Sequence, residues 1–446
     1  MDRTLIIDCN EKVDEQVKIC GFVQTRRDHG KILFLDISDR TGVIQVVLSE
    51  GVNVFHLEGG TDLHPQDVVC IEGKVVKRPE NLVNSNLATG TIELQGERVE
   101  TLSKAAELPF DIGGKDLNLQ LPTLLDYRGL TLRHPKIKAI FKVQEVVIAA
   151  FREGLKKKDF TEFQSPVIIP QTAEGGADVF EVKYFDHKAF LAQSPQFYKQ
   201  ILVGVYERVF TVNKTLRAEP SVTTRHLTEV TTLDAEFGFI DSWLDVMEMA
   251  EYIIKYVIDR VNRECSEVLK DYKITVPKVS DKIPRIKLRE AQEIIFKRTG
   301  RDNRQEPDLQ PEDEREICKW SVEEHGSELI FITHYPVKKR PFYTFEDPDD
   351  LGFTLSFDLI GRGTEWMTGG QRINNLDNLV KNAKNRGIDL AKSELYIQAF
   401  KYGMPPEGGF SFGSERIVMH ILGLANIRQA SLFPRDMERV DIRLNK

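Results

Sequence analysis

The sequence has little cysteine and no long apolar run. Its five cysteines lie far apart, and none forms the Cys-x-x-Cys pair of a zinc site. An odd number of scattered thiols favours a reducing compartment over a disulfide framework. No segment reaches the roughly 18 apolar residues of a membrane span, and the first twelve residues carry acids where a signal peptide needs an apolar run. We therefore expect a soluble cytoplasmic protein.

Excess positive charge and glycine-rich phosphate loops are also missing. Acidic residues outnumber basic ones, and the net charge is −8 at pH 7, so binding through overall basic charge is excluded, although a local basic surface is not. Neither GxxxxGK[ST] nor GxGxxG occurs, which disfavours a P-loop kinase or a dinucleotide oxidoreductase. The 446 residues are long enough for two or three domains.

The first hundred residues predict a small β domain. Short β-rich runs separated by turn residues occupy 17–23, 32–37, 43–48, 68–76 and 91–94. Such a set favours a closed barrel of the oligonucleotide-binding (OB) type, although a five-stranded domain without a ligand fits equally well. We assign 1–105 to this domain and 106–135 to a hinge region.

Several polar and aromatic side chains of this domain are suited to RNA. Arg27 and His29 lie at a strand end, Phe34 in the next strand and Gln45 in the third. An aromatic ring with guanidinium and amide groups beside it can read unpaired bases. The alternative is that Phe34 is a core residue, because its strand neighbours face the other way and must be buried.

Residues 136–446 predict an α+β domain. Apolar and β-rich spacing gives helices at 137–155 and 243–261 and strands at 207–214, 229–239, 353–357 and 364–367. Strands and helices cluster rather than alternate, which favours an antiparallel sheet flanked by helices. The acidic, proline-punctuated run 305–316 is interpreted as a solvated loop.

Arginines and carboxylates are concentrated in this domain. Arg217 and Glu219 would share one face of a strand, and Asp358 and Glu365 flank a glycine turn. Arginine forks neutralise phosphate oxygens, and carboxylates hold Mg²⁺. Phosphoryl or nucleotidyl transfer needs both, whereas any one of these residues alone is more simply a surface ion pair.

These residues resemble the signature motifs of class II aminoacyl-tRNA synthetases, and specifically of aspartyl-tRNA synthetases. The matching segments are 160–166 (FTEFQSP, a dimer-forming element), 217–226, 409–416 (GFSFGSER), 193–199 (QSPQFYK) and 369–372 (GGQR). The catalytic half is similar to the compact archaeal form, and the barrel half, with RRDHG at 26–30, to the bacterial form. The resemblance implies an α+β catalytic domain, an OB-type barrel and a homodimer.

The resemblance also implies the chemistry. Aspartate and ATP would form aspartyl-adenylate, and the 3′ end of tRNA(Asp) would then accept the aspartyl group. The implied catalytic residues are Arg217, Glu365 and Arg416; the implied ATP ligands are Arg217, Glu219, Arg225, His226, Glu365, Gly413 and Arg416, with Mg²⁺ on Asp358 and Glu365. The implied aspartate ligands are Glu174, Gln196, Lys199, Asp234, Thr368 and Arg372.

In the barrel, the resemblance implies that Arg27, His29, Phe34, Gln45 and Asn81 contact the anticodon. His29 resembles the relaxed enzymes that also charge tRNA(Asn), and Gln24 stands where the strict archaeal form carries tryptophan. The alternative is that His29 is a solvated loop residue without a contact. The chain departs from the family pattern at Pro220-Ser221, Thr368, Glu407, Ser411 and the tail after residue 436.

Two other functions stay open at this point. One is a paralogue that passes the adenylate to ammonia as an amide ligase, which would have no need of the barrel. The other is a non-catalytic RNA-binding protein, which would have no need of Arg217, Glu365 and Arg416.

Overall fold

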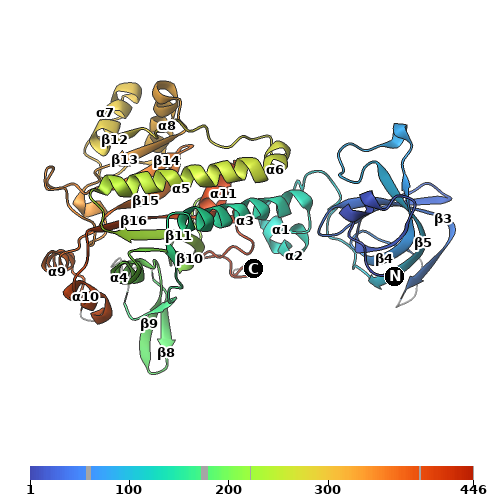
Figure 1. The fold of residues 1–446 in the computed structure, drawn as a ribbon, viewed down its shortest axis with the longest axis horizontal. Helices are drawn as coiled ribbons and strands as arrows, with labels where there is room; N and C mark the ends of the chain where they lie inside the picture. Colours follow the sequence, from blue (N-terminus) through green and yellow to red (C-terminus); the bar gives the residue numbers. More distant parts are fainter. Residues whose placement is uncertain (57–61, 172–178, 221, 391–392, 445–446) are drawn as a thin grey trace. The chain divides into compact units, whose positions relative to one another are not determined.

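The computed structural model describes residues 1–56, 62–171, 179–220, 222–390 and 393–444 (Figure 1). The chain forms two compact units, Met1–Leu119 and Gln120–Lys446. Each unit has its own hydrophobic core, and we describe each by itself.

The first unit is a five-stranded closed barrel with strand order β1-β2-β3-β5-β4, which confirms the predicted OB-type fold. Its strands are β1 (Gln16–Asp28), β2 (Ile32–Ser38), β3 (Val43–His56), β4 (Val68–Lys77) and β5 (Ile92–Ser103), with 3-10 helices at Ile7–Glu11 and Glu80–Leu82. In β2, Leu35 and Ile37 are fully buried, as strand alternation requires. Phe34 precedes Leu35, faces away from it, and is half-buried outside the barrel core.

One disulfide contradicts the expectation of unpaired thiols. Cys20 on β1 and Cys70 on β4 are direct antiparallel partners and are joined by a disulfide. The prediction was wrong for this pair because the two residues are 50 apart in the sequence, and only the strand register places them opposite each other. Cys9, Cys265 and Cys318 are free and buried.

The second unit is built on an eight-stranded sheet with order β12-β13-β14-β15-β16-β11-β10-β6. The strands are β6 (Thr161–Glu162), β10 (Arg208–Leu216), β11 (Glu229–Gly238), β12 (Arg285–Lys287), β13 (Leu329–Thr333), β14 (Ser356–Gly361), β15 (Thr364–Gln371) and β16 (Glu407–Gly413). The six central strands are antiparallel, as predicted, whereas the two outermost strands run parallel to their neighbours. A separate three-stranded sheet has the order β7-β9-β8, and its strands lie between β6 and β10 in the sequence. They are β7 (Ile168–Ile169), β9 (His187–Leu191) and β8 (Glu181–Tyr184).

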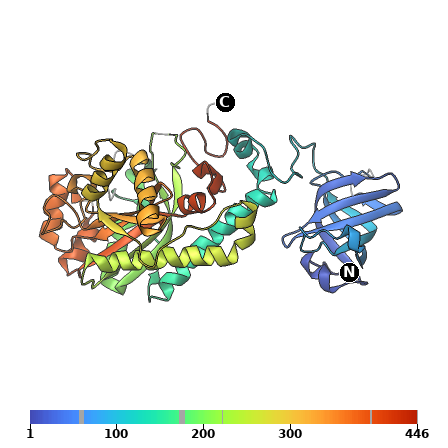
Figure 2. The ribbon, with the colours of Figure 1, turned by 90° about the horizontal axis from the view of Figure 1, so that it is seen from above.

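Helices α3 (Pro135–Lys156) and α5 (Trp243–Glu264) pack against each other and against the sheet in one core (Figure 1, Figure 2). The other helices are α1 (Leu121–Asp126), α2 (Arg128–Thr131), α4 (Gln196–Tyr206), α6 (Ser266–Asp271), α7 (Leu288–Thr299), α8 (Pro311–His325), α9 (Leu376–Asn385), α10 (Glu394–Lys401) and α11 (Ser414–Ile421), with 3-10 turns at Val337–Lys339 and Ile427–Ala430. Within the described residues, no helix combines the length and apolar character needed to cross a membrane.

The interpretation of 305–316 as a solvated loop was wrong for its second half. Helix α8 begins at Pro311, and Gln310 and Asp313 form its capping box. Proline at the first helical position with acids in the first turn is a helix start signal, which the loop interpretation overlooked. This helix brings Glu314 to the site described next.

Candidate functional site

Two adjoining cavities lie on the face of the central strands. One has a volume of about 180 Å³ and is lined by residues of α4, β11 and β15 and by Arg372 directly after β15; Lys199 and Asp234 are among them. The other, of about 110 Å³, is lined by the loop after β10 and by β16 and α11. Both cavities share Arg217, Thr232, Thr368 and Ser411.

Three buried charged residues line the first cavity, Lys199, Asp234 and Arg372, and the buried Glu236 pairs with two of them. The Lys199 Nζ lies 3.1 Å from Asp234 Oδ1 and 3.0 Å from Glu236 Oε2. Arg372 donates from Nε to Glu236 Oε1 at 2.7 Å and from Nη2 to the Gly409 carbonyl oxygen at 3.1 Å. All four side chains are at most 9% exposed. We call Lys199, Asp234, Glu236 and Arg372 the ion cluster.

Within the ion cluster, the opposite charges favour the charged forms of Glu236 and Lys199. Burial raises the pKa of Glu236, but Arg372 and Lys199 outweigh burial and lower this pKa below its usual value. For Lys199, burial lowers the pKa, and the charges of Glu236 and Asp234 more than compensate and raise it. The cavity therefore presents two fixed cations to a ligand, which suits an anionic side chain.

The predicted aspartate ligands largely meet in this cavity. Gln196, Lys199, Asp234, Thr368 and Arg372 all line it. Glu174 lies outside the described residues. Glu236 was missed, although it stands two residues after Asp234 on β11 and therefore shares its face.

The predicted ATP ligands all line the second cavity. The Glu219 carboxylate lies 3.8 Å from Arg217 Nη1 and 3.6 Å from His226 Nε2, and Arg416 Nη1 lies 3.5 Å from Glu365 Oε1. Arg217 and Glu219 do not lie on a strand as predicted, because β10 ends at Leu216. The other two predicted ATP ligands that line this cavity are Arg225 and Gly413.

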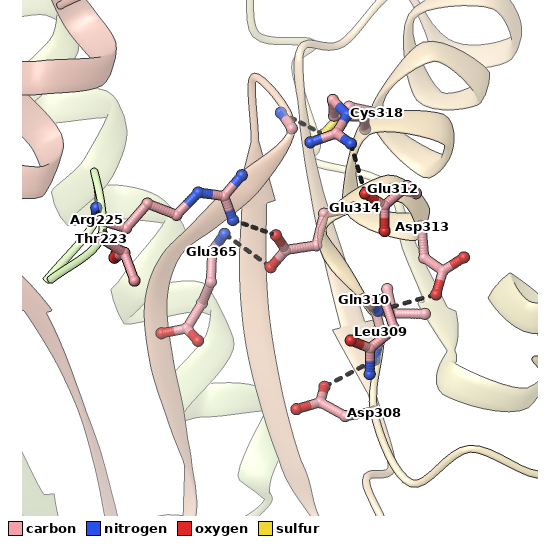
Figure 3. Close-up of polar contacts among 12 residues, drawn as sticks. Thr223, Arg225, Asp308, Leu309, Gln310, Glu312, Asp313, Glu314, Cys318 and Glu365 are labelled. Carbon is pink, nitrogen blue, oxygen red and sulfur yellow. Dashed lines mark hydrogen bonds and ion pairs between the residues drawn. The ribbon is translucent and has the colours of Figure 1, made fainter. Parts of the chain in front are cut away.

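Glu314 contacts two lining residues of the second cavity, Arg225 and Glu365, as Figure 3 shows. Its Oε2 accepts from Arg225 Nη1 at 3.1 Å, and its Oε1 accepts the backbone N–H of Glu365 at 3.2 Å. Burial raises the pKa of Glu314 to about 7, against the charge of Arg225. No motif or spacing indicated this contact, because the sequence interpretation placed Glu314 in a loop far from either partner.

The proposed Mg²⁺ ligands offer only oxygen donors, which suits this hard cation. Asp358 is buried and lies 2.8 Å from Arg340 Nη2, and Arg340 Nη1 donates to Thr368 Oγ1 at 3.1 Å. Burial raises the pKa of Asp358 to about 6, with Arg340 opposing and Glu365 adding to the rise. Within the described ranges, no cluster of three or more His, Cys, Asp or Glu side chains could hold a metal ion.

On the barrel, four of the five predicted anticodon residues form one patch. Arg27 and Phe34 are cross-strand partners, and Arg27 Nη2 donates to Gln45 Oε1 at 3.2 Å. The rings of His29 and Phe34 pack edge to face at 5.5 Å. Asn81 is exposed in the connection between β4 and β5. The position of Phe34 outside the core favours the stacking interpretation over the core interpretation.

Each of the two units matches a known protein family. Residues 120–437 match the family described as tRNA synthetases class II (D, K and N), and residues 17–102 match the OB-fold nucleic acid binding domain. Fold and site therefore define a class II aminoacyl-tRNA synthetase. Within that class, the chain belongs to the aspartate–tRNA ligases, which confirms the predicted family.

Relatives match over nearly the whole chain. The chain is 40% identical to an aspartate–tRNA(Asp/Asn) ligase of Aeropyrum pernix, covering 96% of each protein, and 40% identical to one of Thermus thermophilus, covering 98% of this chain and 99% of the relative. An aspartate–tRNA(Asp) ligase of Pyrococcus abyssi is 38% identical, with 96% of each covered. The structure of Pyrococcus horikoshii asparaginyl-tRNA synthetase with asparaginyl-adenylate aligns with a TM-score of 0.87 at 29% identity, covering 99% of each chain.

The Glu314 contact leads to a pH-dependent prediction. Since Arg225 is a predicted ATP ligand, we expect Glu314→Gln to raise the KM for ATP about fivefold at pH 8, the loss of an ion pair worth about 1 kcal/mol. At pH 6 the ratio should fall toward one. Because its pKa is about 7, Glu314 is ionised and paired above that pH and mostly protonated below it in the wild type.

The measurement is aspartate-dependent ATP–pyrophosphate exchange across this pH range. Glu312→Gln is a matched control, because Glu312 lies in the same helical turn and pairs instead with the exposed Arg301 and Arg315. A Glu314→Gln effect that is equal at both pH values, or one that Glu312→Gln reproduces, would contradict the assignment.

Proposed function

We propose that this chain activates L-aspartate with ATP and transfers it through aspartyl-adenylate to the 3′ end of tRNA(Asp). One observation carries the proposal: Arg217 lines both cavities. The first cavity contains the cations Lys199 and Arg372, and the second is lined by the predicted ATP ligands. An α-carboxylate in the first cavity and an α-phosphate in the second would meet at its guanidinium. Relatives named as aspartate–tRNA ligases support the same reaction.

In the first step, the α-carboxylate of aspartate attacks the α-phosphorus of ATP and pyrophosphate leaves. Positioning and charge neutralisation dominate such a displacement. We assign Arg217 to the α-phosphate, where negative charge accumulates on the oxygens. We assign His226 and Arg416, which also line the second cavity, to the departing phosphates.

Mg²⁺, when bound, would neutralise phosphate oxygens from Glu365 and Asp358. Glu365 lines the nucleotide cavity and is partly exposed, so it is accessible to such an ion. Asp358 is paired with Arg340, which must give up this contact for Asp358 to serve as a ligand.

Selection for aspartate follows from the ion cluster. The side-chain carboxylate of the substrate would take contacts from Lys199 and Arg372, which Glu236 now occupies. Neutral asparagine would compete poorly for two cations that already have a carboxylate partner. Glu174 and Asp234 would face the substrate ammonium, and Gln196 would add a hydrogen bond.

The anticodon would bind to the barrel patch of Arg27, His29, Phe34 and Gln45, with Asn81 from the neighbouring loop. Phe34 would stack on the central base, and the guanidinium and amide groups would read base edges. This patch favours a tRNA ligase over an amide ligase that would use ammonia. We further infer a cytoplasmic homodimer, joined through the segment 160–166.

Arg217 should be indispensable for the first step. We expect Arg217→Ala to reduce aspartate-dependent pyrophosphate exchange by about 3–4 kcal/mol of transition-state stabilisation, as for the loss of an oxyanion-hole donor. Lys214→Ala is the matched control, since Lys214 is an exposed cation on β10, three residues earlier. Exchange within tenfold of the wild type in Arg217→Ala would refute its role.

Arg372 should act on one substrate only. Because Arg372 contacts the first cavity and not the second, we expect Arg372→Leu to raise the KM for aspartate much more than the KM for ATP. Arg372→Lys keeps the charge but loses the guanidinium fork, so it should lie between wild type and Arg372→Leu. Equal changes in both KM values would show that Arg372 does not face the amino acid.

His29 predicts relaxed tRNA recognition. We expect transcripts of both tRNA(Asp) and tRNA(Asn) to be charged, because His29 and Gln24 stand where strict enzymes carry bulkier apolar residues. Parallel charging assays measure the ratio of kcat/KM. If tRNA(Asn) is charged more than about a thousandfold less efficiently, a gap of about 4 kcal/mol, the enzyme is strict.

A further inference from the structure

Glu407 is a buried carboxyl group behind the ion cluster. It begins β16, its side chain is fully buried, and it stands where the resemblance expects histidine. Across the β11–β16 pair, Gly238 faces Glu407 and Glu236 faces Gly409. Glu236 and Glu407 are therefore diagonal neighbours on one face of the sheet, close enough for long side chains to meet.

One oxygen of Glu407 is held by a defined donor. Gln200 donates from Nε2 to Glu407 Oε1 at 2.5 Å. The Tyr396 hydroxyl donates to Gln200 Oε1 at 2.9 Å, which fixes the orientation of the amide and keeps its nitrogen on Glu407. These contacts from α4 and α10 involve only Oε1 of Glu407, so its second oxygen, Oε2, needs another partner.

The second oxygen of Glu407 is buried without a donor, and so is one oxygen of Glu236. Among the described residues, no N–H or hydroxyl group donates to Glu407 Oε2, and no hydrogen-bond donor of suitable geometry reaches Glu236 Oε2, which has only its ion pair with Lys199. Because the two fully buried side chains are diagonal neighbours on one face of the sheet, a hydrogen bond between them would satisfy both oxygens. Two carboxyl groups can form such a bond only when one of them carries a proton.

Charge balance places that proton on Glu407. Glu236 is already held as an anion by Arg372 and Lys199, whereas Glu407 has a neutral amide as its other partner. The charged groups that act on Glu407 are Glu236 and Arg372, and the buried Tyr396 hydroxyl is a further titratable group beside it. Since Glu236 is already balanced by Arg372 and Lys199, a neutral Glu407 adds no uncompensated charge to the buried site. Burial, and then the charge of Glu236, raise the pKa of Glu407 well above its usual value.

We propose that Glu407 is a positioning residue that shares one proton with Glu236 and thereby leaves Lys199 and Arg372 available to the side-chain carboxylate of aspartate. This inference rests on the aspartate site proposed above. When a substrate carboxylate takes contacts from Arg372, the Glu407 hydroxyl still donates to Glu236, so that anion keeps a partner. Loss of the shared proton adds a second negative charge that holds both cations and repels the substrate.

The sign of the pH dependence follows. Below the apparent pKa of the pair the proton is present and aspartate binds. As the pH rises through that value the KM for aspartate increases, approaching tenfold per pH unit, whereas the KM for ATP does not follow it. Glu407→Gln has an amide that donates to Glu236 and accepts from Gln200, and it cannot ionise, so it should remove this increase.

The test measures KM for aspartate and for ATP by pyrophosphate exchange from about pH 7 to pH 9.5 in wild type and Glu407→Gln. We expect the ratio of the two aspartate KM values, wild type over variant, to rise at least threefold across this range. Glu394→Gln, an exposed change of the same kind on α10, should follow the wild type. A ratio that stays level overturns the proposal.

Infrared difference spectroscopy gives a readout that does not depend on activity. The wild type at neutral pH should show the carbonyl stretch of a buried protonated carboxylic acid that Glu407→Gln lacks, and absence of this band also overturns the proposal. If Arg372→Leu leaves the aspartate KM unchanged, the aspartate site itself is wrong. If Arg372→Leu raises it but the pH profiles stay parallel, only the role of Glu407 fails.

Discussion

Glu236 is the carboxylate on which the amino-acid cavity depends. It pairs with Lys199 from α4 and with Arg372 after β15, so one side chain on β11 ties together three segments far apart in the sequence. Burying these charges is costly, and removal of one partner would leave another uncompensated. The geometry of the cavity and its charge are thus set by the same contacts, and any change to Glu236 must alter both.

The sheet allows this arrangement because glycines bring its backbone close to the charged side chains. A Cβ on Gly409 would come within 2.3 Å of Glu236 Oε2, and one on Gly369 within 2.5 Å of the Phe357 ring. Without a side chain at Gly409, its carbonyl oxygen can accept from Arg372 while Glu236 lies directly against the strand. The glycines of these motifs therefore have a packing reason here that is separate from any contact with nucleotide.

Local patterns predicted what depends on local structure. The barrel strands and helices α3 and α5 follow from apolar periodicity, and the two cavities gather residues that motif resemblance identified. The remaining features depend on contacts across long sequence separations. Glu314 reaches Arg225 only because α8 packs beside the sheet, and Cys20 meets Cys70 only through the barrel register. Neither pairing can be predicted from the spacing of residues in the sequence.

The cations of both cavities share one property, which is that each already has a carboxylate partner in the protein. The pairs are Lys199 and Arg372 with Glu236, Arg217 with Glu219, Arg225 with Glu314, Arg340 with Asp358, and Arg416 with Glu365. At the ion cluster, an anionic substrate group can therefore bind by exchange, taking a cation from an internal carboxylate. Glu314 differs, because it also accepts the Glu365 backbone N–H and so holds Arg225 in place for the phosphates. The net gain of such an exchange is small unless the incoming group matches the geometry, so neutral or misplaced groups gain little. Internal pairing thus increases selectivity at the expense of affinity. Substrate binding depends most on pH at the cation whose carboxylate partner is most easily protonated.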